Sequence, residues 1–225
     1  MRRNQSRESH NALSPRSDLR EEIAHRAARL IAEDGMASFA AAKQKAARQM
    51  GITAPGSLPD NREIETALRS YQSLFQSHSQ PLECQVLRQV AVNAMRWLDR
   101  FSPWLVGAVL SGTANRFSQI ELEIIADDAK QLEMFFLNER KLYKMRVKRT
   151  PQSKRGDALS EISSYELSFD ETPVVISHYP HHAVRFAHHS HTSLTDGRAQ
   201  LEDVEGLLVS SISLPAKQPL PEQSR

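Results

Sequence analysis

The sequence predicts an α+β protein in which an N-terminal helical region is followed by a small mixed β-sheet with helices. Residues 17–100 contain four stretches with apolar side chains at helical spacing. From 101 to 210, short apolar or alternating runs that are typical of strands are interleaved with helical stretches. A chain of 225 residues can bury a core in one large domain or in two smaller units. We therefore expect a helical region at 17–100 and an α/β core at 101–210, between disordered tails at 1–16 and 211–225.

The composition indicates a cytoplasmic protein. One cysteine, Cys84, excludes an internal disulfide and suits a reducing compartment. No apolar run approaches the length of a membrane span, and no signal peptide is visible, so we expect no membrane partner. Residues 1–16 have some of the composition of a transit peptide, but no amphipathic helix precedes Ser17. The formal net charge of +2 is too small to argue for a nucleic-acid partner by itself.

Cap residues and apolar spacing predict the four N-terminal helices. Ser17 is the expected N-cap of the first helix, which ends at Gly35, and Asp60 is the expected N-cap of the third. The second helix is expected at 38–50 and the fourth at 81–100. The predicted buried stripes are Leu19, Ile23, Ala27, Leu30 and Ile31 in the first helix, Ile64, Ala67, Leu68, Tyr71, Leu74 and Phe75 in the third, and Leu82, Val86, Val90, Met95 and Leu98 in the fourth.

Residues 30–53 resemble the first two helices of a TetR-type DNA-binding domain. The resemblance lies in LIAEDGM at 30–36, the helix after it, and the Gly-Ile-Thr at 51–53. A recognition helix should come next. The residues that exclude it are Pro55, Gly56 and Pro59. A sequence-specific DNA partner is therefore not expected. The cations of the second helix, read as a solvated face or as a modest phosphate-binding patch, are Lys43, Lys45 and Arg48.

The stretch at 106–127 has the pattern of a strand, a glycine-containing turn and a second strand. Residues 104–110 form an apolar run that predicts a buried strand. Gly107 and Gly112 allow the backbone to approach a neighbouring strand or a phosphate closely. Along the second strand the side chains alternate. One face carries Gln119, Glu121 and Glu123, and the other carries Ile120, Leu122 and Ile124.

This stretch resembles the signature of the nucleotidyltransferase (DNA polymerase beta-like) superfamily. Val106-Gly107-Ala108 corresponds to its hydrophobic-Gly-Ser element, Gly112-Thr113-Ala114 to its Gly-Thr turn, and Ser118 to the residue before the acids. Gln119-Ile120-Glu121-Leu122 then corresponds to the acid pair, so Ala108 replaces a serine and Gln119 replaces the first carboxylate. The resemblance covers about 20 of the 225 residues. It implies a nucleotidyltransferase-like core in which Gly107, Gly112, Thr113 and Ser118 contact the nucleotide.

The resemblance also implies a site for Mg²⁺ or Mn²⁺, because nucleotidyl transfer uses metal ions clamped by carboxylates. A register two residues later makes Glu121 and Glu123 both the catalytic and the metal-binding pair. The family needs a third carboxylate on a later strand, but residues 174–179 contain none, and Glu166 on the preceding strand is a weak substitute. The alternative is that the polar residues are the solvated face of an antiparallel strand.

The remaining elements complete the predicted sheet. Asp127 and Asp128 are expected to begin a helix that ends near Glu139, followed by a third strand at 142–147. Strands at 165–169 and 174–179 form a hairpin that turns at 171–173, and a short helix at 201–209 closes the core.

Two further segments have a composition that suggests ligand or metal binding. Residues 148–160 are expected to form a basic loop that is either solvated or able to steer a phosphorylated ligand. The stretch at 178–191 is rich in histidine and is either a metal site or a polar loop. Its histidines are His178, His181, His182, His188, His189 and His191.

The function hypothesis is a nucleotidyltransferase-like protein that binds a nucleotide and has weak or lost transfer activity. The first alternative is an active metal-dependent nucleotidyltransferase. The second is a non-enzymatic module that binds a protein partner through the helical region. No G-x-x-x-x-G-K-[ST] phosphate loop and no G-x-S-x-G elbow occur, which argues against P-loop ATPases and α/β-hydrolases.

Overall fold

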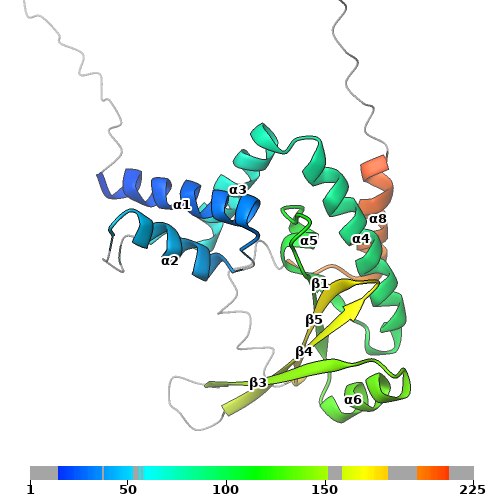
Figure 1. Cartoon of the computed structure of the whole chain (residues 1–225). Coiled ribbons are helices and arrows are strands. Elements are labelled where there is room, and N and C mark those ends of the chain that lie inside the picture. The colour runs from blue at the N-terminus through cyan, green and yellow to red at the C-terminus, as the bar shows by residue number, and fades with distance from the viewer. Residues whose placement is uncertain are drawn as a thin grey trace, which may run out of the picture. The chain divides into compact units, whose positions relative to one another are not determined.

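A computed structural model describes residues 15–36, 38–52, 56, 58–151, 159–181 and 197–212, so both expected tails lie almost entirely outside the description. The chain divides into two compact units, Met1–Phe75 and Gln76–Arg225. The fold is α+β, with a helical N-terminal region and a mixed five-stranded sheet (Figure 1). Residues expected to be helical from 17 to 100 are helical over most of that range, but the division between units falls inside it. No helix in the described part of the chain is both long and apolar enough to span a bilayer.

The first unit contains three helices, α1 (Pro15–Asp34), α2 (Phe39–Gln49) and α3 (Asn61–Phe75). Their shared core confirms most of the predicted stripes and includes Ile23, Ala27, Ala42, Ala46, Ile64 and Leu68. Two predictions are wrong at helix ends. Ser17 lies inside α1 rather than capping it, because the helix already includes Pro15, a residue that is tolerated in a first turn. Leu74 and Phe75 are 74% and 70% exposed, because the apolar pattern of α3 extends past the helices it packs against.

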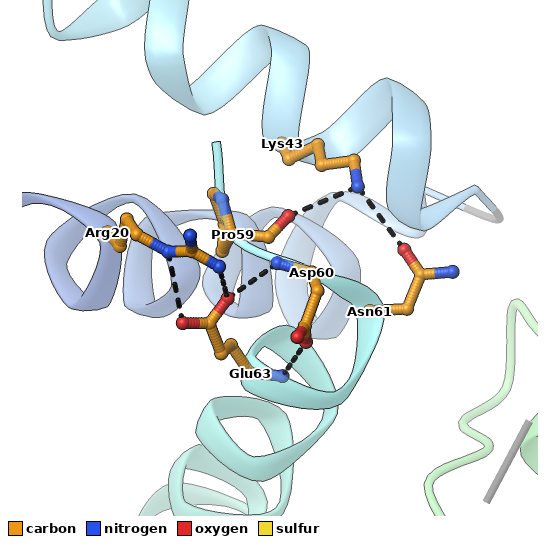
Figure 2. A network of polar contacts seen from close by, with 6 residues as sticks. All are labelled: Arg20, Lys43, Pro59, Asp60, Asn61 and Glu63. Atoms are coloured by element: carbon orange, nitrogen blue, oxygen red, sulfur yellow. Dashed lines mark hydrogen bonds and ion pairs between the residues drawn. The ribbon is translucent and has the colours of Figure 1, made fainter. Parts of the chain in front are cut away.

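A polar network holds the start of α3 against the other two helices (Figure 2). Asp60 Oδ1 accepts the Glu63 backbone N–H at 2.9 Å, and Glu63 Oε2 accepts the Asp60 N–H at 2.6 Å, which is a reciprocal capping box. Glu63 also pairs with Arg20 of α1 at 2.7 Å. From α2, Lys43 Nζ donates to the Pro59 carbonyl at 3.2 Å and to Asn61 Oδ1 at 3.4 Å. The predicted cap at Asp60 is therefore confirmed.

The second unit begins with α4 (Ser79–Trp97) and a short 3₁₀ turn, η2 (Asp99–Phe101). The predicted stripe on α4 is partly wrong, since Leu82 and Val86 are 64% and 63% exposed. The helix carries two apolar stripes, and the second one packs inward. Its members are Cys84, Leu87, Ala91, Val92, Ala94 and Met95.

Five strands form the sheet, in the order β1-β2-β5-β4-β3. They are β1 (Trp104–Val106), β2 (Ile120–Ile125), β3 (Tyr143–Pro151), β4 (Leu159–Phe169) and β5 (Thr172–Tyr179). β2 and β5 are parallel, and the other neighbouring pairs are antiparallel. The remaining helices are α5 (Gly107–Ser111), α6 (Ala129–Asn138) and α8 (Leu201–Ile212). One face of the sheet packs on α4 and α6 through a core that includes Leu105, Leu122, Ile176, Leu132 and Phe136.

The structure confirms most of the later elements and changes three boundaries. Asp128 caps α6 through its carboxylate at 2.9 Å from the Lys130 N–H. The hairpin between β4 and β5 turns at Asp170 and Glu171, which have φ angles of 47° and 62°. β3 and β4 extend into the segment at 148–160 that was expected to be a loop. The strand expected at 104–110 ends at Val106, because Gly107 has a φ of +72° and starts α5.

Candidate functional site

The stretch singled out in the sequence forms β1, α5, a turn and β2. β1 and β2 are antiparallel, with Val106 opposite Glu121 and Trp104 opposite Glu123. Two glycines in the left-handed region bound α5, since Gly107 has a φ of +72° and Gly112 a φ of +81°. The chain therefore makes the strand-turn-strand path that the sequence predicts, with one helical turn in place of the end of the first strand.

Gly107 lies directly against the side chain of Glu121. A Cβ atom built on Gly107 would lie 2.8 Å from Glu121 Oε2 and 3.0 Å from its Cδ, closer than real Cβ atoms approach other atoms. Position 107 therefore favours glycine for its backbone angle, and the flexible Glu121 side chain fills the space beside it. In this structure the absence of a side chain at Gly107 leaves room for the Glu121 carboxylate.

Glu121 and Glu123 lie on the same face of β2, opposite the buried Ile120, Leu122 and Ile124. Glu123 is 9% exposed, and its Oε2 lies 2.7 Å from Nη2 of Arg198. This contact is an ion pair rather than a well-aligned hydrogen bond. Burial, reinforced by the negative charge of Glu123, raises the pKa of Tyr179 to about 12. The Tyr179 hydroxyl is therefore protonated at neutral pH.

The neighbouring strands supply no third carboxylate to this pair. On β5, Val175 lies opposite Glu121 and Ser177 lies opposite Glu123. Glu166, the weak substitute on β4, is paired with Arg146 of β3 at 3.2 Å. Among the described residues, no group of three or more His, Cys, Asp or Glu side chains could hold a metal ion. As the residues stand here, the donors do not fit Mg²⁺ or Mn²⁺, because Arg198 neutralises one of the two carboxylates whose charge would hold the cation.

The turn after α5 is held by internal hydrogen bonds. The Ser111 and Thr113 hydroxyls lie 2.9 Å apart, and Thr113 is buried. The Ser118 hydroxyl bonds the Asn115 backbone N–H at 3.0 Å and the Asn115 side-chain oxygen at 3.3 Å. Gly112 presents its carbonyl to Gln80 at 2.9 Å. The turn residues predicted to contact a nucleotide thus lie near one another, and they stabilise the turn itself.

Two residues of α4 that the sequence analysis did not single out anchor this turn. Gln80 Nε2 donates to the carbonyls of Gly112 and Ala114 at 2.9 and 2.7 Å. Arg88 donates to the carbonyls of Val109 and Leu110, at the end of α5, at 3.1 and 3.2 Å. Apolar spacing identifies the buried side of α4, but a glutamine or arginine on a helix carries no signal that names its distant carbonyl partner.

The histidines do not form a cluster in the described part of the chain. His178 lies on the core face of β5, is 3% exposed, and burial lowers its pKa. The backbone N–H of His181 donates to Asp127 Oδ1 at 3.2 Å. The other four predicted histidines, His182, His188, His189 and His191, lie outside the described residues.

The cations of α2 have protein partners as well. Lys43 bonds Pro59 and Asn61 as described above. Lys45 pairs with Asp34 at 3.1 Å, and Arg48 Nε donates to the Gln44 carbonyl at 3.3 Å. Their side chains therefore stabilise the helical unit.

No protein-family model, curated protein or solved structure matches this chain. The resemblance to nucleotidyltransferases stays a prediction that depends on the residues of one strand-turn-strand stretch.

Proposed function

We propose that this protein is a nucleotidyltransferase-like protein that binds a nucleotide and has weak or lost capacity for metal-dependent transfer. The observation that supports the proposal is the Arg198–Glu123 ion pair, at 2.7 Å, beside Glu121 on the same strand face. It lies where the sequence resemblance expects a metal-binding acid pair. A cytoplasmic location belongs to the same proposal, on the evidence of a single buried cysteine.

Electrostatics favour lost transfer activity. Two carboxylates hold a divalent cation through their negative charge, and Arg198 cancels one of these charges at contact distance. Ser177 is the β5 residue opposite Glu123, and serine adds no charge. Displacing Arg198 with a metal ion would leave a guanidinium that is only 18% exposed without its partner, which is costly.

The same arginine favours retention of an anionic ligand. A guanidinium presents its donors in a planar fork that suits phosphate as well as carboxylate. Arg198 pairs with Glu123 on the acid face of the sheet, and our proposal is that its guanidinium also binds a phosphate group of the nucleotide. Nucleotide binding through this group requires no metal ion.

Calorimetry with ATP, CTP, GTP and UTP, each in Mg²⁺, in Mn²⁺ and in EDTA, tests the proposal. We expect heat for at least one nucleotide, retained in EDTA and lost in Arg198→Gln. Arg198→Lys is the matched control, because it keeps a cation at the same position. If none of the four nucleotides gives a heat of binding, nucleotide binding is excluded from the proposal.

An active nucleotidyltransferase is the second candidate, favoured by the seating of Glu121 against Gly107 on the face that also carries Glu123. It predicts release of pyrophosphate that requires Mg²⁺ or Mn²⁺ and is abolished by Glu121→Gln. Release that survives this substitution would exclude the mechanism. Absence of release together with nucleotide binding supports the leading proposal.

A protein-interaction module is the third candidate, favoured by the exposed Leu82 and Val86 on α4. Such a role predicts that Leu82→Ser with Val86→Ser prevents the isolation of a partner with the full chain. Nucleotide heats should stay unchanged in that variant. A partner retained by the variant would move the interface away from α4.

A further inference from the structure

The basic charge of this protein is concentrated in one segment. Residues 140–156 contain eight arginines and lysines and no aspartate or glutamate. The formal charge of the whole chain is +2, so the rest of the chain is net negative by six charges. The eight cations are Arg140, Lys141, Lys144, Arg146, Lys148, Arg149, Lys154 and Arg155. The net charge of the whole chain is small, but this segment has a strong local positive potential.

The structure places the first part of this segment on the edge strand β3. Among the described strands β3 has one neighbour, β4, and residues Lys144 to Val147 are all exposed. β4 pairs with β5 only as far as Ser163, but it pairs with β3 as far as Leu159. Four residue pairs, from Lys148–Ile162 to Pro151–Leu159, therefore form a two-stranded ribbon that extends beyond the sheet (Figure 1).

Side-chain alternation separates charge from apolar surface on β3. Tyr143 packs on Phe136 and Tyr165, which assigns the odd-numbered positions to the core face of the sheet. Met145 and Val147 follow on that face, and Lys144 and Arg146 lie on the opposite one. Glu166 pairs with Arg146 at 3.2 Å, and the Arg146 side chain is still 74% exposed. By the same alternation Arg149 belongs to the face of Met145 and Val147, and Glu161 of β4 is its register partner.

We propose that the basic β3 edge and its ribbon bind the phosphate backbone of a nucleic acid. A two-stranded ribbon is narrow enough to follow or enter a nucleic-acid groove, and lysines and arginines along one strand match a line of phosphates. Charged residues also protect edge strands from aggregation. The feature that favours phosphate as the ligand is the run of six cations without an acid between residues 140 and 151.

A membrane surface fits the segment less well. Segments that lie in a membrane interface bury a broad apolar face in the lipid and keep their cations on the opposite face. On the described part of β3 the exposed apolar residues are Met145 and Val147, which give only a small apolar face for that mode of binding. The proposal does not depend on the proposed nucleotide site, because its residues and its ligand are different.

Fluorescence anisotropy of the full chain tests the proposal. The probes are labelled single-stranded RNA, single-stranded DNA and duplex DNA of about 20 nucleotides or base pairs. This length exceeds the site size of a single-strand-binding fold, which reaches roughly 16 nucleotides. Affinity should fall steeply between about 50 and 200 mM salt. Combining Lys144→Gln, Arg146→Gln and Lys148→Gln, the even-numbered cations of β3, should weaken binding about tenfold or more at low salt. The slope of log affinity against log salt should become shallower by about 2, because three contacts contribute roughly 0.7 each on a single strand.

Two matched variants separate local charge from folding and from total charge. Lys144→Arg, Arg146→Lys and Lys148→Arg in one chain should retain the affinity and the slope. Arg62→Gln, Arg116→Gln and Lys130→Gln remove three exposed cations elsewhere and should have little effect on the slope. Thermal melts by circular dichroism establish that each variant folds. If the triple glutamine variant fails to fold, Lys144→Gln alone should make the slope shallower by about 0.7.

Three results would overturn the proposal. The first is no binding of any nucleic acid at about 50 mM salt, a concentration at which phosphate contacts are strong. The second is an unchanged slope in the triple glutamine variant. The third is binding, dependent on β3, to vesicles that contain phosphatidylserine, with no binding to nucleic acid.

Discussion

Two arginine–glutamate pairs in this protein have the same length and different surroundings. Arg20–Glu63 and Arg198–Glu123 both have a nitrogen–oxygen distance of 2.7 Å. The side chains of the first pair are 36% and 39% exposed, and those of the second are 18% and 11% exposed. Glu63 also accepts the Asp60 N–H, so its carboxylate has a second donor. The comparison teaches that exposure to solvent, rather than contact distance, decides how much stability is lost when one partner of such a pair is removed.

The two arginine–glutamate pairs also have different roles in the molecule. Glu63 completes the cap of α3 and joins it to α1 in the helical unit. Glu123 lies in the stretch where the sequence predicts a metal site, and its ion pair consumes the negative charge that a metal would use. Removing the arginine from each pair therefore tests the comparison directly.

The largest expected effect is that of Arg198→Met. It leaves the charge of Glu123 buried without a partner, which costs about 3–5 kcal/mol of unfolding free energy. Urea denaturation at neutral pH measures the loss. The double variant Arg198→Met with Glu123→Leu should be close to the wild type, because neither charge then remains buried. A loss below about 1 kcal/mol in the single variant would mean that the pair behaves like an exposed one.

The next largest effect is expected for Gly107→Ala. The left-handed backbone angle costs about 1–2 kcal/mol for a residue with a Cβ. The new methyl group would also meet the Glu121 carboxylate at 2.8 Å, but this is the end of a flexible side chain that can move aside at little cost. A loss of about 1–2 kcal/mol should appear in urea denaturation, and nearly the same loss is expected in a Glu121→Ala background. A loss too small to resolve would contradict the left-handed backbone at position 107.

Local patterns explain why the elements of the fold could be predicted. The cap residues Asp60 and Asp128 and the alternation along β2 depend on neighbours within four residues, and all three are confirmed. Leu82 and Val86 were misassigned because α4 is apolar on two sides, and only tertiary packing selects one of them. Ser17 was misassigned because nothing local forbids the helix from including Pro15.

The site could be predicted only in part. Alternation along the strand gave the shared face of Glu121 and Glu123. The ion pair with Arg198 joins residues 75 positions apart in the sequence, and no spacing rule connects them. The anchors Gln80 and Arg88 were missed for the same reason, since their partners are carbonyls on another element. Long-range polar contacts of this kind require coordinates.

A third, smaller effect depends on pH and concerns the buried His178. Burial lowers the pKa of His178, while Asp127, Asp128, Glu133 and the Ala126 carbonyl oppose the shift. The unfolded chain therefore takes up a proton on this residue more readily than the folded chain does. The unfolding free energy should fall as pH drops below about 6.5 and level off below the folded pKa.

The variant His178→Leu isolates the contribution of this histidine. Its unfolding free energy should lose less between pH 8 and pH 5 than that of the wild type, because position 178 no longer binds a proton. Urea denaturation across that range measures both curves. Parallel curves would show that His178 is not the group responsible.

The smallest effect is expected for Arg20→Gln, which is the counterpart of Arg198→Met in the helical unit. Glu63 stays in contact with water and keeps the Asp60 N–H, so no charge is left buried without a partner. The change in urea denaturation should be too small to resolve from repeat measurements. Asp60→Ala gives the reference for sensitivity, because loss of a helix cap costs about 1 kcal/mol. An Arg20→Gln loss as large as that of Arg198→Met would mean that contact distance outweighs exposure, contrary to the comparison of the two pairs.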